Sequence, residues 1–494
     1  MASGESSPHT VAGAAAALGT KMPAPHSLLV PSGTDDGGNY TENRNSRQTK
    51  FPPFLGLHRS QTRKQSVVVQ RLRATTIDNR RPAVSAPPVD PENAMQAETE
   101  VIDPYNGLRT TQTTLPSRAY WDEAEYHRDL ETIWYRNWLM LCREADIAQP
   151  HAFRVFTVGT QEILVLRDES GTLRAFHNTC RHRGSQLCRE SEGRLKARLL
   201  TCPYHAWSYS LSGELVRVPS RTLPPDFDKA DYPLYRVALS VWRGFVFVNL
   251  DEEATGSAAQ SFDPGSGDLA NWPLEELATG HVLRKVMNCN WKIFWENFNE
   301  CLHCPGVHKH LSHLVPIYGR GLMARHDDSE WALHADNDAP EYAGGLRAGA
   351  ETWSEDGRVH GPVFETLSEA ERAAGQTYAM HLPSMFIVGH VDYVRTVRLL
   401  PLGSEQTELT AEWLFPAKAL TSDGADLENI ISFGTRVLEE DAAVCELNQK
   451  GLHSRRHSTG VLMPEEYELY RFHEWVRGQH TAHAVTSISA DNAR

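Results

Sequence analysis

Three side chains able to bind protons or metals recur at helical spacing near the middle of the chain. Glu296, Glu300 and His303 stand at i, i+4 and i+7, so a helix there would present them on one face. Pro305, followed by glycine, predicts the end of that helix, and His308 comes shortly after it. Two imidazoles and one carboxylate with open coordination positions are the ligands of mononuclear non-haem Fe(II) sites that activate dioxygen. The sequence therefore predicts an iron site here.

Other interpretations fit the same stretch. A single histidine on an apolar helix is commonly a hydrogen-bonded core residue. Cys301 and Cys304 form a C-x-x-C pair that could bind zinc together with His303 or His308. The predicted helix also carries four apolar side chains, which indicate that it is buried and that its polar face points into an enclosed site. These side chains are Trp291, Trp295, Phe298 and Leu302.

A second group of metal-binding residue types lies upstream. Cys180 and His182 form a C-x-H pair, and Cys202 and His205 form a C-x-x-H pair. Two thiolates and two imidazoles could hold zinc, or a Rieske [2Fe–2S] cluster with two Cys on one iron and two His on the other. A zinc finger would need a helix carrying its histidines, whereas the surrounding apolar runs predict strands. These strands are expected at 162–166, 173–176 and 244–250.

The order C-x-H…C-x-x-H and then E-x-x-x-[DE]-x-x-H-x-x-x-x-H resembles that in the α subunits of Rieske non-haem iron oxygenases. The resemblance covers about residues 105–478. In this family the cluster passes electrons one at a time to an iron, where O2 is split and a bound substrate is oxidised. The resemblance implies a cluster held by Cys180, His182, Cys202 and His205, and an Fe(II) held by His303 and His308.

The resemblance also assigns roles to two acidic residues. The third iron ligand is usually an Asp on a late helix, and Asp441 is the best match, with Glu439 and Glu440 as competitors. Glu300 occupies the position of the acid that links the cluster of one subunit to the iron of its neighbour. Ring-hydroxylating members usually have Asp there, so Glu resembles the branch that oxidises quaternary amines, such as the choline, glycine betaine and carnitine oxygenases.

The expected fold class is α+β: a β-rich Rieske domain, then a catalytic domain in which helices carrying the iron cover an antiparallel sheet. Residues 1–95 read as a disordered or non-native extension, with a transit peptide or a late start codon as alternatives. The other predicted segments are a helical arm at 105–136, the Rieske domain at 137–252, a linker at 253–271, the catalytic domain at 272–478 and a tail at 479–494.

Local patterns place elements within these segments. Residues 120–141 have helical periodicity, and the polar stretch 324–371 predicts loops over the site. Apolar runs predict strands at 385–388, 394–400 and 408–415 behind the iron helix. A buried helix is expected at 437–446.

Composition limits the partners. The formal net charge is −14 and no basic stripe is visible, which argues against nucleic acid. No apolar run is long enough to cross a membrane. Most of the eight cysteines lie in or near the metal motifs, which favours ligands in a reducing, cytoplasmic setting over a disulfide framework.

The chain contains no recognisable site for collecting electrons from NAD(P)H. It has no G-x-G-x-x-G after a strand and no run of four cysteines of the plant ferredoxin type. A separate reductase with flavin or iron–sulfur centres is therefore expected. The resemblance also implies a head-to-tail homotrimer, in which His205 of one subunit approaches Glu300 of the next.

The expected substrate is a quaternary or tertiary amine whose N-methyl carbon is hydroxylated and then lost as formaldehyde. Hydroxylation without demethylation, as in choline oxidation, is a near relative of this reaction. Aromatic-ring dioxygenation and a non-enzymatic zinc-binding module are the alternatives. Because a quaternary ammonium keeps its charge, aromatic faces should bind it, although core packing is the other role open to each ring. The aromatic candidates are Phe298, Tyr378, Phe386 and Tyr393, followed by Phe294, Tyr318 and Trp413. Arg395 and Arg398, expected on one strand face, could bind a substrate carboxylate or be solvated charges.

Overall fold

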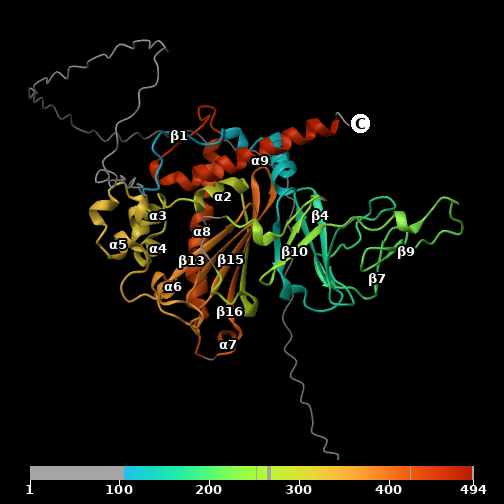
Figure 1. The fold of residues 1–494 in the computed structure, drawn as a ribbon, viewed down its shortest axis with the longest axis horizontal. Helices are drawn as coiled ribbons and strands as arrows, with labels where there is room; N and C mark the ends of the chain where they lie inside the picture. The colour runs from blue at the N-terminus through green and yellow to red at the C-terminus, as the bar shows by residue number, and fades with distance from the viewer. Residues whose placement is uncertain (1–104, 252, 264–268, 423, 492–494) are drawn as a thin grey trace, which may run out of the picture. The chain divides into compact units, whose positions relative to one another are not determined.

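A five-stranded antiparallel sheet forms the centre of the C-terminal half of this computed structural model, which describes residues 105–251, 253–263, 269–422 and 424–491 (Figure 1). The predicted extension at 1–95 lies outside these residues. The predicted strands at 385–388, 394–400 and 408–415 are confirmed, and two outer strands were missed. The order is β12 (Leu277–Met287), β16 (Gln406–Pro416), β15 (Val394–Gly403), β14 (Met385–His390) and β13 (Gln376–His381).

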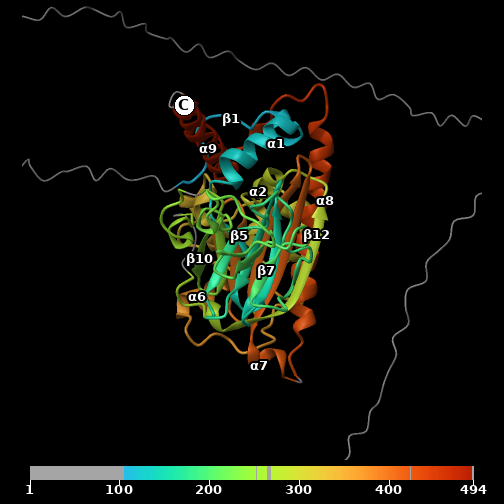
Figure 2. The ribbon, with the colours of Figure 1, turned by 90° about the vertical axis from the view of Figure 1, so that its right-hand side faces the viewer.

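Helix α8 (Leu427–Leu452) runs along one face of this sheet (Figure 2), and α2 (Trp291–Phe298) packs against α8. The side chain of Asn290 starts α2 by accepting a hydrogen bond from the amide of Lys292. The helix ends at Phe298, earlier than predicted. A short helix, α3 (Cys304–Val307), follows after a turn. Pro305 lies in its first turn, where a missing N–H costs nothing, so this proline helps to start a helix and does not end one.

The early end of α2 changes the role of Glu296. Glu296 does not share a helix face with Glu300 and His303, as the spacing had predicted. Its buried carboxylate accepts a hydrogen bond from Tyr120 Oη at 2.7 Å and lies 2.9 Å from Nε2 of His473. Glu296 therefore ties α2 to neighbouring core elements. The prediction that the apolar face is buried holds for Trp291 and Trp295, whereas Phe298 is partly buried and Leu302 is 39% exposed.

The N-terminal arm consists of several short elements, although one helix was predicted over 120–141. Asp122 caps α1 (Glu123–Asp129), a π-helical turn follows at Leu130–Trp134, and β2 (Leu139–Arg143) begins after it. A buried ion pair between Asp129 and Lys292 joins the arm to α2. Nε2 of His480, on helix α9 (Tyr467–Asp491), lies 2.9 Å from Oδ1 of Asp129. Because α9 runs from 467 to 491, the predicted domain boundary at 478 falls inside this helix.

The β-rich part lies beside the catalytic sheet. The predicted strands at 162–166, 173–176 and 244–250 are confirmed as β4 (Gln161–Arg167), β5 (Leu173–His177) and β11 (Phe245–Asn249). The remaining strands are β3 (Ala152–Val158), β6 (Glu192–Arg194), β7 (Leu199–Thr201), β8 (Ser208–Ser210), β9 (Leu215–Arg217) and β10 (Ala238–Trp242), which with β2, β4, β5 and β11 make three small sheets. Backbone atoms of β2 bond to Ser384 and Arg398 of the catalytic domain. Among the described residues, no helix has the length and apolar character needed to span a membrane.

Candidate metal centres

Two loops of the β-rich part share one backbone turn. The amide of Gly184 donates to the carbonyl of Cys180 at 2.9 Å, and the amide of Ala206 donates to the carbonyl of Cys202 at 3.1 Å. Gly184 and Ala206 both have positive φ, at 73° and 54°. In each loop the cysteine amide also donates to the carbonyl five residues later, at 2.8 Å. The two metal-ligand motifs are therefore built on equivalent local turns.

The cysteine and histidine side chains of these two loops differ in their burial. Both thiols are buried, whereas His182 is exposed and His205 is half-buried. The two imidazole rings lie 4.8 Å apart between centroids, at 78° to one another. This set of two inner sulfurs and two outer nitrogens fits a Rieske cluster, whose irons carry different ligands.

Two residues that the sequence reasoning missed support the cluster loops. Tyr209 Oη lies 3.2 Å from the sulfur of Cys180 and accepts from the amide of Arg181. Trp207 stacks on the ring of His182 at 4.8 Å. Both residues lie at or just after the second motif, but a buried aromatic has no sequence signature that separates such a role from core packing.

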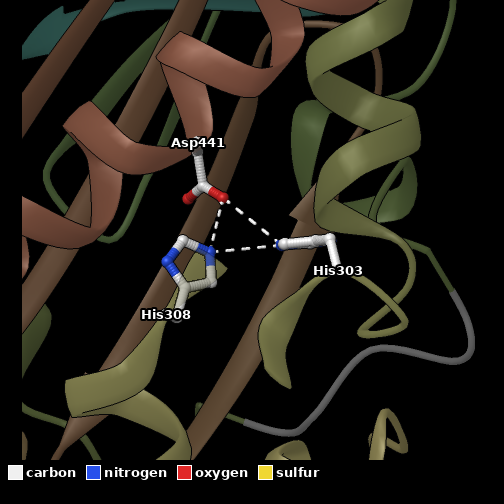
Figure 3. A group of neighbouring side chains, drawn as sticks. All are labelled: His303, His308 and Asp441. Carbon is white, nitrogen blue, oxygen red and sulfur yellow. Dashed lines mark hydrogen bonds and ion pairs between the residues drawn. The ribbon is translucent and has the colours of Figure 1, made fainter. Parts of the chain in front are cut away.

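The second centre brings together His303, His308 and Asp441 (Figure 3). Nε2 of His308 lies 3.2 Å from Nε2 of His303 and 2.8 Å from Oδ1 of Asp441, and the third side of the triangle measures 3.5 Å. Metal–ligand bonds of about 2.1 Å at right angles place ligand atoms about 3 Å apart. The donor atoms therefore fit a single metal ion, and two imidazoles with one carboxylate are suited to Fe(II).

Each histidine of this triad uses its other ring nitrogen to bind a carboxylate. Nδ1 of His303 donates to Glu300 at 2.5 Å, and Nδ1 of His308 donates to Glu440 at 2.8 Å. A carboxylate can only accept, so both Nδ1 atoms hold a proton, and the Nε2 atoms, which face Asp441, are the ones that would bind a metal. Glu440 is thus an orienting group for His308, a role that sequence reasoning missed, and Glu439 is exposed to solvent.

The triad is electrostatically coupled in the metal-free protein. Burial alone would lower the pKa of His303, but hydrogen bonds to Asp441 and Glu300 outweigh burial and raise this pKa to about 9. Burial alone would raise the pKa of Asp441, but hydrogen bonds from both histidines lower it to about 2. Binding of a metal ion must therefore displace a proton from His303.

Cys301 and Cys304 form a disulfide on either side of His303. The prediction that this C-x-x-C pair could bind zinc is wrong for this structure, because both sulfurs are already bonded to each other. The expectation that the cysteines serve as ligands and not in disulfides is likewise wrong for this pair.

A cavity of about 660 Å³, with its opening included, adjoins the triad. Among the predicted aromatic residues, five line it: Phe294, Phe298, Tyr318, Tyr378 and Phe386. Two do not. Tyr393 is buried in the core and donates to the carbonyl of Trp353 at 2.9 Å, and Trp413 is fully buried in the sheet. Trp353, from the polar stretch 324–371, adds an aromatic wall that the sequence did not indicate.

The two arginines of β15 lie on opposite faces of the sheet, because residues three apart on a strand point in opposite directions. Arg395 lines the cavity, whereas Arg398 bonds to Leu141 and Glu408 on the other side. Both are buried, so the expectations of a shared face and of solvated charges are wrong.

Two family models match the chain in the order of its domains. The model "Rieske [2Fe-2S] domain" matches residues 137–228, and "Ring hydroxylating alpha subunit (catalytic domain)" matches residues 269–482. The chain belongs to the Rieske non-haem iron oxygenases. These two domains imply that the oxygenase holds one Rieske cluster and one mononuclear iron.

The oxygenase has relatives of stated activity. It is 29% identical to a glycine betaine monooxygenase oxygenase subunit from Chromohalobacter salexigens, over 73% of this chain and 84% of that protein. It is 27% identical to a choline monooxygenase, chloroplastic, from Beta vulgaris, over 74% of this chain and 76% of that protein.

Solved structures share the fold of the oxygenase. The quaternary ammonium Rieske monooxygenase CntA in complex with an inhibitor has a TM-score of 0.55 and 21% identity, covering 75% of this chain and 96% of that one. Naphthalene 1,2-dioxygenase from Rhodococcus sp. has a TM-score of 0.53 and 20% identity, covering 74% and 94%. Such similar scores show one shared fold for enzymes with different substrates.

Proposed function

We propose that this oxygenase hydroxylates an N-methyl carbon of a quaternary or tertiary amine. One oxygen atom of O2 enters the C–H bond, the other leaves as water, and two electrons and two protons complete the balance. The hydroxymethyl amine then collapses to formaldehyde and the demethylated amine. The observation that carries the proposal is the cavity beside the triad, because aromatic rings make up much of its lining. The named activities of the betaine and choline relatives support the same substrate class.

The residues at the two centres have different roles in this reaction. When bound, the Rieske cluster supplies single electrons and the Fe(II) activates O2. Cys180, His182, Cys202 and His205 would hold the cluster, and His303, His308 and Asp441 would hold the iron. Glu300 and Glu440 keep the two imidazoles in the ligand tautomer. The cavity walls position one methyl group beside the iron and exclude water.

Electrons would come from NAD(P)H through a separate reductase and would pass between subunits of a homotrimer. Figure 1 supports transfer between subunits, because the strands beside the cluster loops (β7 and β9) lie at the opposite side of the chain from α3, next to the triad. A head-to-tail ring would bring His205 of one subunit to Glu300 of the next. Analytical ultracentrifugation tests the trimer directly, and a monomer active with its reductase would contradict this arrangement.

The first test is composition followed by activity. Purified protein should be red-brown, with about three irons and two acid-labile sulfides per chain and the low average g-value of a His-ligated cluster on reduction. A panel of N-methylated amines, with O2 and a reductase, should then release formaldehyde. Zinc without sulfide would remove the redox function. A dihydroxylated aromatic product without formaldehyde would favour the ring-dioxygenase alternative.

A further inference from the structure

Arg395 is a buried cation that forms no ion pair with any residue that the structure describes. Its side chain is only 4% exposed, and it lines the cavity beside the triad. Its Nε and Nη1 atoms are buried and donate to no group in the part of the chain that the structure describes. Burying an unpaired charge is costly, so such a group is expected to meet an anion that the protein itself does not supply.

Two other buried cations show what a structural role looks like in this fold. Lys292 forms an ion pair with Asp129. Arg398, on the same strand as Arg395, bonds to the carboxylate of Glu408 at 2.8 Å and to a backbone carbonyl. Within the described ranges, Arg395 has neither kind of partner, although it is buried to a similar degree.

The carboxylates nearest to Arg395 in the cavity are already engaged. Asp441 is bound to both histidines of the triad, and Glu300 accepts bonds from His303 and from two backbone amides. These are the cavity's two carboxylates among the described residues. Neither forms an ion pair or a hydrogen bond with Arg395 among the described residues, although the charge of Asp441 acts on the guanidinium through space.

A second unpartnered donor lies next to the guanidinium. The indole ring of Trp353 lies 5.9 Å from Cζ of Arg395 and also lines the cavity. Its Nε1 atom is buried without an acceptor among the described residues. Arg395 and Trp353 together therefore present three buried donor nitrogens that have no acceptor among the described residues, and such donors are suited to an oxyanion.

The neighbouring helix leaves space for this group. On α8, a Cβ at Gly434 would stand 3.1 Å from Nη1 of Arg395 and 3.0 Å from the ring of Trp413. Glycine at 434 therefore allows α8 to approach the guanidinium closely. Seven residues separate Gly434 from Asp441 on the same helix, which is about 10 Å along its axis. The guanidinium therefore faces the same cavity as the triad, about two helical turns away along α8.

Resting on the proposed function, we propose that Arg395, assisted by Trp353, binds a carboxylate of the substrate, so that the substrate is a compact N-methylated amino acid zwitterion and not an amino alcohol. The carboxylate would accept charge-assisted hydrogen bonds from the guanidinium. The ammonium group would then lie among the rings of Phe298, Tyr378 and Phe386, with one methyl toward the triad.

Four ligands of similar shape test how much each of the two charges of such a substrate contributes to binding. Glycine betaine has both charges, and choline has only the cation. The anion of tert-butylacetic acid (3,3-dimethylbutanoate, here tert-butylacetate) has only the carboxylate, and tert-butylethanol (3,3-dimethylbutan-1-ol) has neither charge. Binding to the oxidised, iron-loaded protein is measured by calorimetry without reductase, so the result does not depend on turnover. Glycine betaine should bind on the order of 100-fold more tightly than choline, because the charged hydrogen bonds to Arg395 are lost with the alcohol.

Variants assign the difference to one residue. Arg395→Gln should remove most of the preference for glycine betaine over choline, whereas Arg395→Lys should keep a part of it because the charge remains. Arg284→Gln is the matched control, since it removes an arginine from an exposed position of the same sheet. If Arg395→Gln does not fold, the comparison of ligands on the unchanged protein still decides the proposal.

The outcomes separate this inference from the proposed function. Choline binding as tightly as glycine betaine would overturn the carboxylate site but leave amine oxidation intact. Binding of tert-butylacetate as tight as that of glycine betaine, lost in Arg395→Gln, would uphold the carboxylate site and contradict the amine substrate class. Failure of all four ligands to bind the loaded protein would overturn the zwitterion assignment.

Discussion

The two metal centres of this oxygenase are assembled in different ways. The cluster ligands come from two loops of one small β-domain, and each loop is closed by its own backbone hydrogen bonds. In the iron triad, His303 and His308 flank the short helix α3, whereas Asp441 lies on α8, 133 positions after His308. The first centre therefore depends mainly on local turns, and the second depends on how α8 packs against the sheet. Substitutions can test this difference at each centre.

The largest effect is expected at the cluster. Cys180→Ser removes a thiolate ligand, so the protein should lose its acid-labile sulfide and its visible colour while keeping about one iron per chain. Cys188→Ser is the control, because Cys188 is a buried free cysteine of the same β-domain outside the two motifs. Iron, sulfide and absorption spectra measure both. A coloured Cys180→Ser protein would contradict the ligand assignment.

The next effect is expected at the triad. Asp441→Asn replaces the anionic ligand by a neutral amide, so the mononuclear iron should be lost and activity should fall by about 100-fold or more, with the cluster unchanged. Glu439→Gln, two residues earlier on the exposed side of α8, should retain iron and activity. Iron content and the spectrum of the reduced cluster report the two centres separately. Loss of iron from Glu439→Gln alone would reverse the assignment.

Glu300 tests whether the two centres communicate. Glu300→Gln should leave both metals bound but slow the oxidation of the reduced cluster by O2 and substrate on the order of tenfold to 100-fold, since the bond to Nδ1 of His303 is weakened. Single-turnover absorption of the cluster measures this rate. Unchanged kinetics would argue against a link through Glu300.

A smaller effect is expected at the group that orients His308. Glu440→Gln keeps a hydrogen-bond acceptor at Nδ1 but removes the charge, so iron affinity should fall by about tenfold without being abolished. Titration with a competing chelator measures the change. A loss as large as that in Asp441→Asn would mean that Glu440 is itself a ligand.

The smallest effect is a pH dependence confined to the metal-free protein. The folded-state pKa of His303 is raised from 6.5 to about 9, so the protonated imidazole stabilises the fold fully below pH 6.5. This contribution is lost as the pH rises through 9. The melting temperature of metal-free protein should therefore fall between pH 6.5 and 9, whereas iron-loaded protein should show little of this loss. Identical pH profiles for the two forms would contradict the coupling.

The sequence by itself predicted the residues whose geometry is local. The C-x-H and C-x-x-H spacings fit within single turns, and the five-residue step from His303 to His308 fits across one short helix. The strands at 385–388, 394–400 and 408–415 were also predictable, because long apolar runs at the centre of a sheet admit few other structures.

Tertiary packing decided the rest. Glu439, Glu440 and Asp441 are three adjacent acids that point in different directions from α8. The packing of that helix directs Asp441 to the two histidines of the triad, Glu440 to Nδ1 of His308 and Glu439 to solvent. The helix end at Phe298 moved Glu296 into the core, where bonds to Tyr120 and His473 make this end favourable. Arg395 and Arg398 are the same residue type on one strand. Only the different surroundings of the sheet's two faces leave Nε and Nη1 of Arg395 without an acceptor in the described part of the chain. Ligand spacing is a property of a few adjacent residues, whereas the partner of a buried charge is set by distant segments that meet only in the folded chain.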